Sequence, residues 1–340
     1  MRLKINASSC INPGIFSTEA VITAPPVNAC NDFQVPPINY SRHIDARQLR
    51  RLSKVAKMGI YTAKACMAQT PGQDAQALIV GTSTGGFSAL DSFINNMNEK
   101  EEQNLSPVFF LQSLLSDVTG QIVLSMGIKG YTTTYTNRGS AFESSLLDAQ
   151  LLLEENPDQT VLVGGTDELP QVYGDIVRHS GFLEPEEQMT GPSSISLGEN
   201  AIFFSLSKAS DRDKVYIVDC GTYLGLDKKN INQQLEAFLQ ENGHLTTDID
   251  LVLSGFYNQD QFEAFFPEGN LKKNVVFFKQ YCGEFSTSTA FGVWLAEQLL
   301  SAKISPEALE LPTPFELKNI LVINQFRASN FSFTLLSSNQ

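Results

Sequence analysis

The residues best placed to do chemistry lie in a turn at residues 137–140, between an extended segment and a helix. From Tyr131 to Leu169 the sequence predicts an extended entry, this sharp turn, an amphipathic helix and a strand buried on both faces. A strand-to-helix elbow projects one side chain toward the N–H groups and positive dipole end of the helix, which suits a nucleophile. The turn offers Arg138, Gly139 and Ser140. None of them is an obvious nucleophile.

Ser140 has two interpretations. A hydroxyl at an elbow can act as a nucleophile when a general base lies beside it. The chain has three histidines, and the surroundings of His43, His179 and His244 predict surface or structural roles. As an alternative, Ser140 caps the helix and Glu143 completes a capping box three residues later. We expect the cap.

Arg138 also has two interpretations. Its side chain could project inward, pair with Glu143 or Glu284 and fill a cavity, because a buried guanidinium needs a charged partner. Equally, it could form a salt bridge on the surface. The sequence does not decide between them.

Composition excludes several classes of function. The chain has 340 residues, is 42% hydrophobic and carries a formal charge of −13, which argues against a nucleic-acid surface or docking on anionic membrane. No apolar run is long enough for a membrane span, and the N-terminal residues lack the apolar core of a signal peptide. Five scattered cysteines without CxxC spacing predict reduced thiols in the cytoplasm and no zinc site. The loop GTSTGG lacks a P-loop lysine and predicts a tight turn, so we expect no cofactor.

The order of predicted elements repeats along the chain. An amphipathic helix from Asp45 precedes buried strands and helices, and the series finishes with a hairpin of residues 200–208 and 214–220. A second, fainter series ends in another hairpin at residues 319–336. The sequence therefore predicts an α/β fold of two duplicated halves, residues 1–222 and 223–340, in a single compact unit.

Five segments together carry a family resemblance over nearly the whole chain. They are VGTSTGG, SPVFFLQSLLSDVTGQIVLSMGIKG, SSLLDAQLLL with VLVGGTDE, LGENAIFFSLSK and FKQYCGEFSTSTA. In order and spacing the chain resembles a β-ketoacyl-ACP synthase of the thiolase fold. The resemblance implies a five-layer α-β-α-β-α architecture. It also implies a dimer in which the strand at Val161–Gly165 pairs across a two-fold axis.

The resemblance also shows what is missing. Family members carry a nucleophilic cysteine at the elbow and two histidines on later loops, which assist decarboxylation. Those positions fall on Gly139, Gly255 and Glu284, whereas the family's active-site lysine matches Lys279. Glycine cannot be acylated, and an ionised Glu284 would repel an enolate.

The chain therefore resembles a chain-length factor, the inactive partner of an active ketosynthase in polyketide, polyene or fatty acid synthesis. Its expected partners are a ketosynthase or a second copy, and an acyl carrier protein. The residues expected near the former pocket are Arg138, Ser140, Phe142, Glu143, Cys282 and Phe326. One alternative is an active acyltransferase or decarboxylase that uses Ser140 or Cys282. The other is a homodimeric scaffold that binds acyl carriers or lipids.

Overall fold

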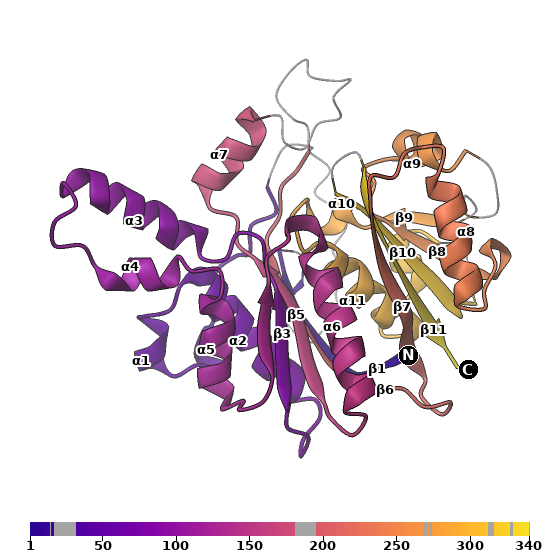
Figure 1. Ribbon diagram of the computed structural model, residues 1–340, viewed down its shortest axis with the longest axis horizontal. Coiled ribbons are helices and arrows are strands. Elements are labelled where there is room, and N and C mark those ends of the chain that lie inside the picture. The colour runs from indigo at the N-terminus through magenta and orange to yellow at the C-terminus, as the bar shows by residue number, and fades with distance from the viewer. Residues whose placement is uncertain are drawn as a thin grey trace.

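The computed structural model of the chain consists of two half-sheets and three helical layers (Figure 1). The structure describes residues 1–13, 15–16, 32–180, 195–267, 271, 274–311, 316–326 and 329–339. Among these residues no helix is long and apolar enough to cross a membrane.

The first half-sheet has the order β4-β3-β5-β6-β1. Its strands are β4 (Thr132–Tyr135), β3 (Ala77–Gly81), β5 (Val161–Asp167), β6 (Asn200–Lys208) and β1 (Leu3–Asn12), with the short β2 (Ile15–Phe16) beside β1. β3 runs parallel to β4 and β5, whereas β6 is antiparallel to both β5 and β1.

The second half-sheet repeats this order and these directions as β9-β8-β10-β11-β7. Its strands are β9 (Val275–Phe277), β8 (Leu251–Ser254), β10 (Asn319–Phe326), β11 (Asn330–Ser338) and β7 (Val215–Leu224). Pairing of β1 with β7 joins the halves into one sheet. Because β7 is the first strand of the repeat, we propose that the halves meet before Val215 rather than at residue 222.

Helices form the other three layers. α6 (Ala141–Glu155) and α11 (Thr289–Leu300) lie between the half-sheets, where each contacts strands of both. α2 (Lys54–Met67) and α5 (Asp117–Met126) cover the outer face of the first half-sheet, and α8 (Ile231–Glu241) packs on the second with α9 (Gln259–Phe265). The expected five-layer thiolase-like architecture is therefore confirmed.

The remaining helices are short or peripheral. They are η1 (Tyr40–Arg42), α1 (Ala46–Leu49), α3 (Phe87–Glu99), α4 (Pro107–Gln112), η2 (Arg138–Ser140), α7 (Gln171–His179), η3 (Thr246–Asp248), α10 (Lys279–Cys282) and η5 (Pro306–Leu309). α3 and α4 project together from the body (Figure 1). The helix predicted from Asp45 is two helices, because Ser53 caps a new one by accepting a hydrogen bond from Ala56 N.

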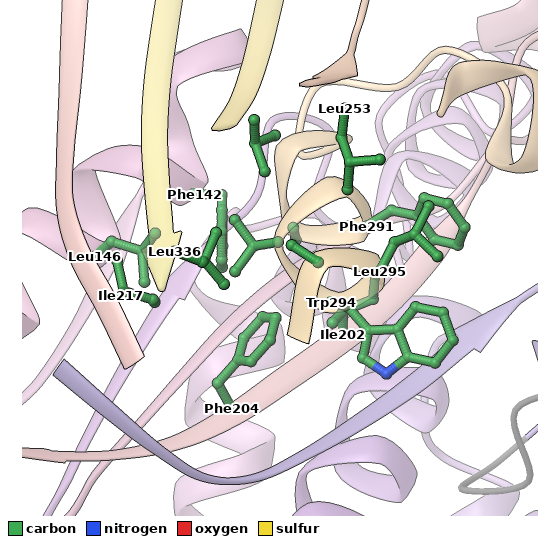
Figure 2. Close-up of a cluster of buried hydrophobic side chains, with 14 of the residues drawn as sticks. Phe142, Leu146, Ile202, Phe204, Ile217, Leu253, Phe291, Trp294, Leu295 and Leu336 are labelled. Carbon is green, nitrogen blue, oxygen red and sulfur yellow. The ribbon is translucent and has the colours of Figure 1, made fainter. Parts of the chain in front are cut away.

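Strand alternation distributes side chains between the layers. In β3, Ala77 and Ile79 face α6 and α11, whereas Leu78 and Val80 face α2 and α5. Figure 2 shows the central cluster, in which Phe142 of α6 and Trp294 of α11 meet side chains from both half-sheets. This shared core holds the halves as one unit and fixes the elbow at the start of α6.

Two strand predictions are wrong. β6 and β7 do not form a hairpin, because β1 pairs with both and lies between them. The strand at Val161–Gly165 cannot pair across a dimer axis, because β5 already pairs with β3 and β6 on its two sides. The free edge of the first half-sheet is β4. The hairpin of β10 and β11 is confirmed.

Candidate functional site

The elbow forms where it was predicted, between β4 and α6. Arg138 has a positive φ of 56°, so the backbone strain of the turn lies on that residue. The Arg138 side chain is exposed and does not fill the site, contrary to one of its two interpretations. Ser140 makes no side-chain capping bond, so the expected capping box is absent.

Phe326, at the end of β10, occupies the space that a nucleophile would need. Gly139 is buried, and a Cβ atom added there would overlap the Phe326 ring and its Cβ atom. The φ of Gly139 is not positive, so its backbone would accept another residue. The obstacle to a side chain at the predicted nucleophile position is therefore the Phe326 side chain.

The first histidine position is closed by the same strand. A Cβ atom added at Gly255 would overlap Asn324 Oδ1 and approach Asn324 Cα to 3.1 Å. The Gly255 N–H also donates to the carbonyl of Ile323 at 2.7 Å. A histidine at this position would have to displace Asn324 and the backbone of β10.

The second histidine position holds a buried ion pair. Glu284 Oε2 lies 2.6 Å from the ammonium group of Lys279 and accepts a hydrogen bond from the Tyr257 hydroxyl at 2.7 Å. Both charged side chains are at most 4% exposed. Lys279 also donates to the carbonyl of Gln325 at 3.0 Å. Lys279 is therefore bound to a carboxylate and to β10.

Glu143 lies beneath the elbow in the interior between the halves. It accepts hydrogen bonds at Oε1 from Thr289 at 2.5 Å and from Ser332 at 2.7 Å, and burial raises its pKa. Asn324 donates to the Thr289 hydroxyl at 2.7 Å. Glu143 is thus a structural link from α6 to α11 and β11, and no local sequence pattern predicts these donors.

The carboxylate of Asp167 binds the GTSTGG loop and accounts for its conformation. Its Oδ1 accepts hydrogen bonds from the amides of Ser83 at 2.7 Å and Thr84 at 3.1 Å, and from the Thr82 hydroxyl. Its Oδ2 accepts from the amide and hydroxyl of Thr287. The anion held by this glycine-rich loop is therefore a carboxylate of the chain itself, as befits a tight turn rather than a phosphate cradle.

What remains of a pocket is small. Its cavity volume is about 20 Å³, room for one or two water molecules. Its lining comprises Thr84, Asp167, Glu168, Tyr173, Val177, Leu197, Gly198, Glu284, Phe285, Ser286 and Phe326. Of the expected pocket residues, Phe326 lines it, as does Glu284 at the predicted position of the second histidine. Arg138, Ser140, Phe142, Glu143 and Cys282 do not, and Phe142 and Cys282 belong to the core.

The candidate alternative nucleophiles lack the necessary surroundings. Cys282 is fully buried, and burial raises the pKa of its thiol, which keeps it protonated. In the described part of the chain no hydrogen bond joins a histidine to Ser140 or Cys282. His43 packs against the ring of Tyr61, and His179 bonds the carbonyl of Asp175. The described residues also contain no cluster of His, Cys, Asp or Glu suited to a metal ion.

Comparison with known proteins finds β-ketoacyl synthases. Residues 27–190 match the sequence model of the β-ketoacyl synthase N-terminal domain. The predicted resemblance to β-ketoacyl synthases is confirmed. A 3-oxoacyl-[acyl-carrier-protein] synthase 2 of Staphylococcus aureus strain N315 is 24% identical over 136 residues, 38% of this chain and 33% of that protein. The ketosynthase-like chain therefore aligns with about a third of the length of the curated relatives it matches.

Solved structures share the fold over the whole chain. A type II polyketide ketosynthase in complex with its acyl-carrier protein aligns with a TM-score of 0.80 and 14% identity, covering 99% of both chains. The ishigamide ketosynthase/chain length factor aligns with a TM-score of 0.79 and 15% identity, covering 100% of this chain and 99% of that one. At this level of identity the likeness establishes the fold alone.

Proposed function

We propose that the chain is a non-condensing, chain-length-factor-like partner of an active ketosynthase in fatty acid, polyketide or polyene synthesis in the cytoplasm. The observation that carries the proposal is the overlap of Phe326 with any side chain at Gly139. The carboxylate of Glu284 adds to it, because it lies where the family needs a group that stabilises an enolate. A site without these groups is expected to shape or support a partner's site rather than catalyse.

An open strand edge supports the proposed dimer. β4 forms one edge of the sheet and pairs on one side only, with β3. Apolar side chains lie exposed on the neighbouring elements, with Leu124 of α5 at 79%, Leu151 of α6 at 62% and Tyr131 at 46%. An exposed edge between apolar flanks is a surface that another sheet can extend. We propose that the partner subunit pairs here, rather than at Val161–Gly165.

A basic surface supports a carrier-protein partner. Residues 42–64 hold seven of the 24 lysines and arginines but only one acidic residue, in a chain of net charge −13. Four of these side chains are exposed, namely Arg42, Arg47, Arg50 and Arg51. Charge on this scale attracts an acidic protein at short range, within a Debye length of about 8–10 Å. We propose an acidic acyl carrier as that protein.

The first test is condensation itself. The purified chain should turn over malonyl-ACP and an acyl-ACP at least about 10³-fold more slowly than an active ketosynthase, because it lacks both nucleophile and imidazoles. Mixed with its active ketosynthase partner, it should form a complex that condenses. Product analysis detects condensation, and intact mass detects acylation of the chain. Either result with the isolated chain would refute the proposal.

The second test addresses the edge of β4. Leu124→Glu with Leu151→Glu should break the complex with the ketosynthase, or a homodimer, because two charges would enter an apolar interface. Light scattering coupled to gel filtration measures the assembly. Leu224→Glu with Leu245→Glu is the matched control, since these leucines are 73% and 56% exposed on the second half. An assembly unchanged by the first pair would place the interface elsewhere.

A further inference from the structure

The last three residues of β10 close the former catalytic site together. Asn324 lies against Gly255, the Gln325 carbonyl accepts from Lys279, and Phe326 covers Gly139. Successive side chains of a strand point to opposite faces. The side chains of Asn324 and Phe326 can therefore point to one face, while Gln325 between them makes its contact through the backbone carbonyl. We call residues 324–326 the plug.

The plug lies beyond the end of one of its neighbouring strands. β10 pairs with β11 as far as Phe326–Asn330, but its pairing with β8 ends at Ile323–Ser254. On the β8 side, the hydrogen bond from Lys279 therefore falls where strand pairing has stopped. α10, which carries Lys279, follows directly after β9.

Lys279 can hold the plug because its own position is fixed. The Lys279 side chain is 2% exposed. Its ammonium group lies 2.6 Å from Glu284 Oε2, and Tyr257 donates to that same oxygen. Glu284 is fixed in turn, since its backbone amide donates to the Ser196 carbonyl and its carbonyl accepts from Gly198 N. This chain of contacts joins the end of β10 to the segment before β6.

We propose that Lys279 and Glu284 form a latch that holds the plug shut, and that releasing the latch opens the pocket onto Gly139. Glu284 and Phe326 both line the residual pocket, so outward movement of the plug would enlarge it. Lys279 is in this view a positioning residue for β10. The proposal goes beyond the partner role and holds whichever protein the chain binds.

The test compares local opening in latch variants. Lys279→Met keeps the length of the side chain but removes its charge and donors. Hydrogen exchange followed by mass spectrometry should show at least about tenfold faster opening at residues 323–326 and at residues 138–142 of the elbow. Alkylation of Cys282, which lies between Lys279 and Glu284, should accelerate similarly. β5, Cys66 and Cys220 should be unchanged, since these thiols are buried in other parts of the structure.

Two further variants separate the latch from general stability. Lys279→Met with Glu284→Gln leaves no unpaired buried carboxylate, so its melting temperature should recover while the fast local opening persists. Lys303→Met is the matched control. Lys303 pairs with Glu297 at a distance of 2.8 Å, and this ion pair does not contact the plug. Unchanged exchange at the elbow in Lys279→Met would overturn the latch. Equal acceleration throughout the protein in both latch variants would overturn it as well.

Discussion

Replacing Gly139 with cysteine is expected to destabilise the protein and yield an unreactive thiol. The new Cβ atom would overlap the Phe326 ring, which is buried and held at the end of β10. Overpacking of this kind costs about 1–3 kcal/mol, and a backbone shift of the plug would raise the cost further. The free energy of unfolding in urea and the rate of alkylation by iodoacetamide measure the two effects.

Removing the obstacle should reverse both effects. In Gly139→Cys with Phe326→Gly, which removes both the ring and the Cβ atom at position 326, the thiol gains room, so its alkylation should be at least about tenfold faster than in the single variant. The double variant should also recover part of the stability lost by the single one, a non-additivity expected of residues in contact. It should still not condense malonyl-ACP, because Gly255 and Glu284 remain at the imidazole positions.

Gly120→Cys is the matched control for the cysteine itself. Gly120 is exposed in α5, and nothing lies within 4 Å of a Cβ atom added there. This variant should keep full stability and react rapidly. If Gly139→Cys were as stable and as reactive as Gly120→Cys, Phe326 would not block the nucleophile position.

Local patterns in the sequence predict where the family's catalytic positions fall. Counting back from Asp148-Ala149 places the nucleophile position at Gly139, and the lysine-to-glycine spacing of KQYCGE places the second histidine position at Glu284. The resemblance places Phe326 near the pocket, but no local pattern predicts that its side chain fills the space beside Gly139, because Phe326 comes from the other half of the chain. Only the three-dimensional register of β10 against β8 places Asn324 beside Gly255.

The capping prediction failed for a related reason. Ser140 and Glu143 have the spacing of a capping box, a pattern that rests on local hydrogen bonds. Glu143 instead lies in the interior, because the hydroxyl groups of Thr289 in α11 and Ser332 in β11 donate hydrogen bonds to one of its carboxylate oxygens. Tertiary partners therefore overrode the local preference.

The hydrophobic pattern of the sequence predicts the edge strand better than the family resemblance does. Val161–Gly165 is apolar on both faces, which is typical of an interior strand, whereas the polar TTTY of β4 suits an edge. The family resemblance, by contrast, predicts the dimer strand at Val161–Gly165. The hydrophobicity of the two segments alone would have favoured β4.

Asp167→Ala is expected to give the largest loss of stability among these variants, about 3–5 kcal/mol. Asp167 is 2% exposed, and it accepts from the backbone amides of Ser83, Thr84 and Thr287. Without the carboxylate these three donors would lose their partner, and each buried donor left unsatisfied costs about 1–3 kcal/mol. The carboxylate joins the turn after β3 to the segment before α11, so both halves should loosen near the pocket. Urea unfolding measures the loss.

Asp250→Ala provides the comparison that makes the Asp167 result interpretable. Asp250 Oδ2 also accepts from two backbone amides, those of Lys318 and Asn319, but its side chain is only half-buried. Water can replace the carboxylate there, so the cost should stay near about 1 kcal/mol. Asp167→Asn should fall between the two alanine variants, because one end of the amide presents N–H groups to donors. Equal losses for Asp167→Ala and Asp250→Ala would show that the buried carboxylate does not organise the site, and that packing around the plug alone keeps it closed.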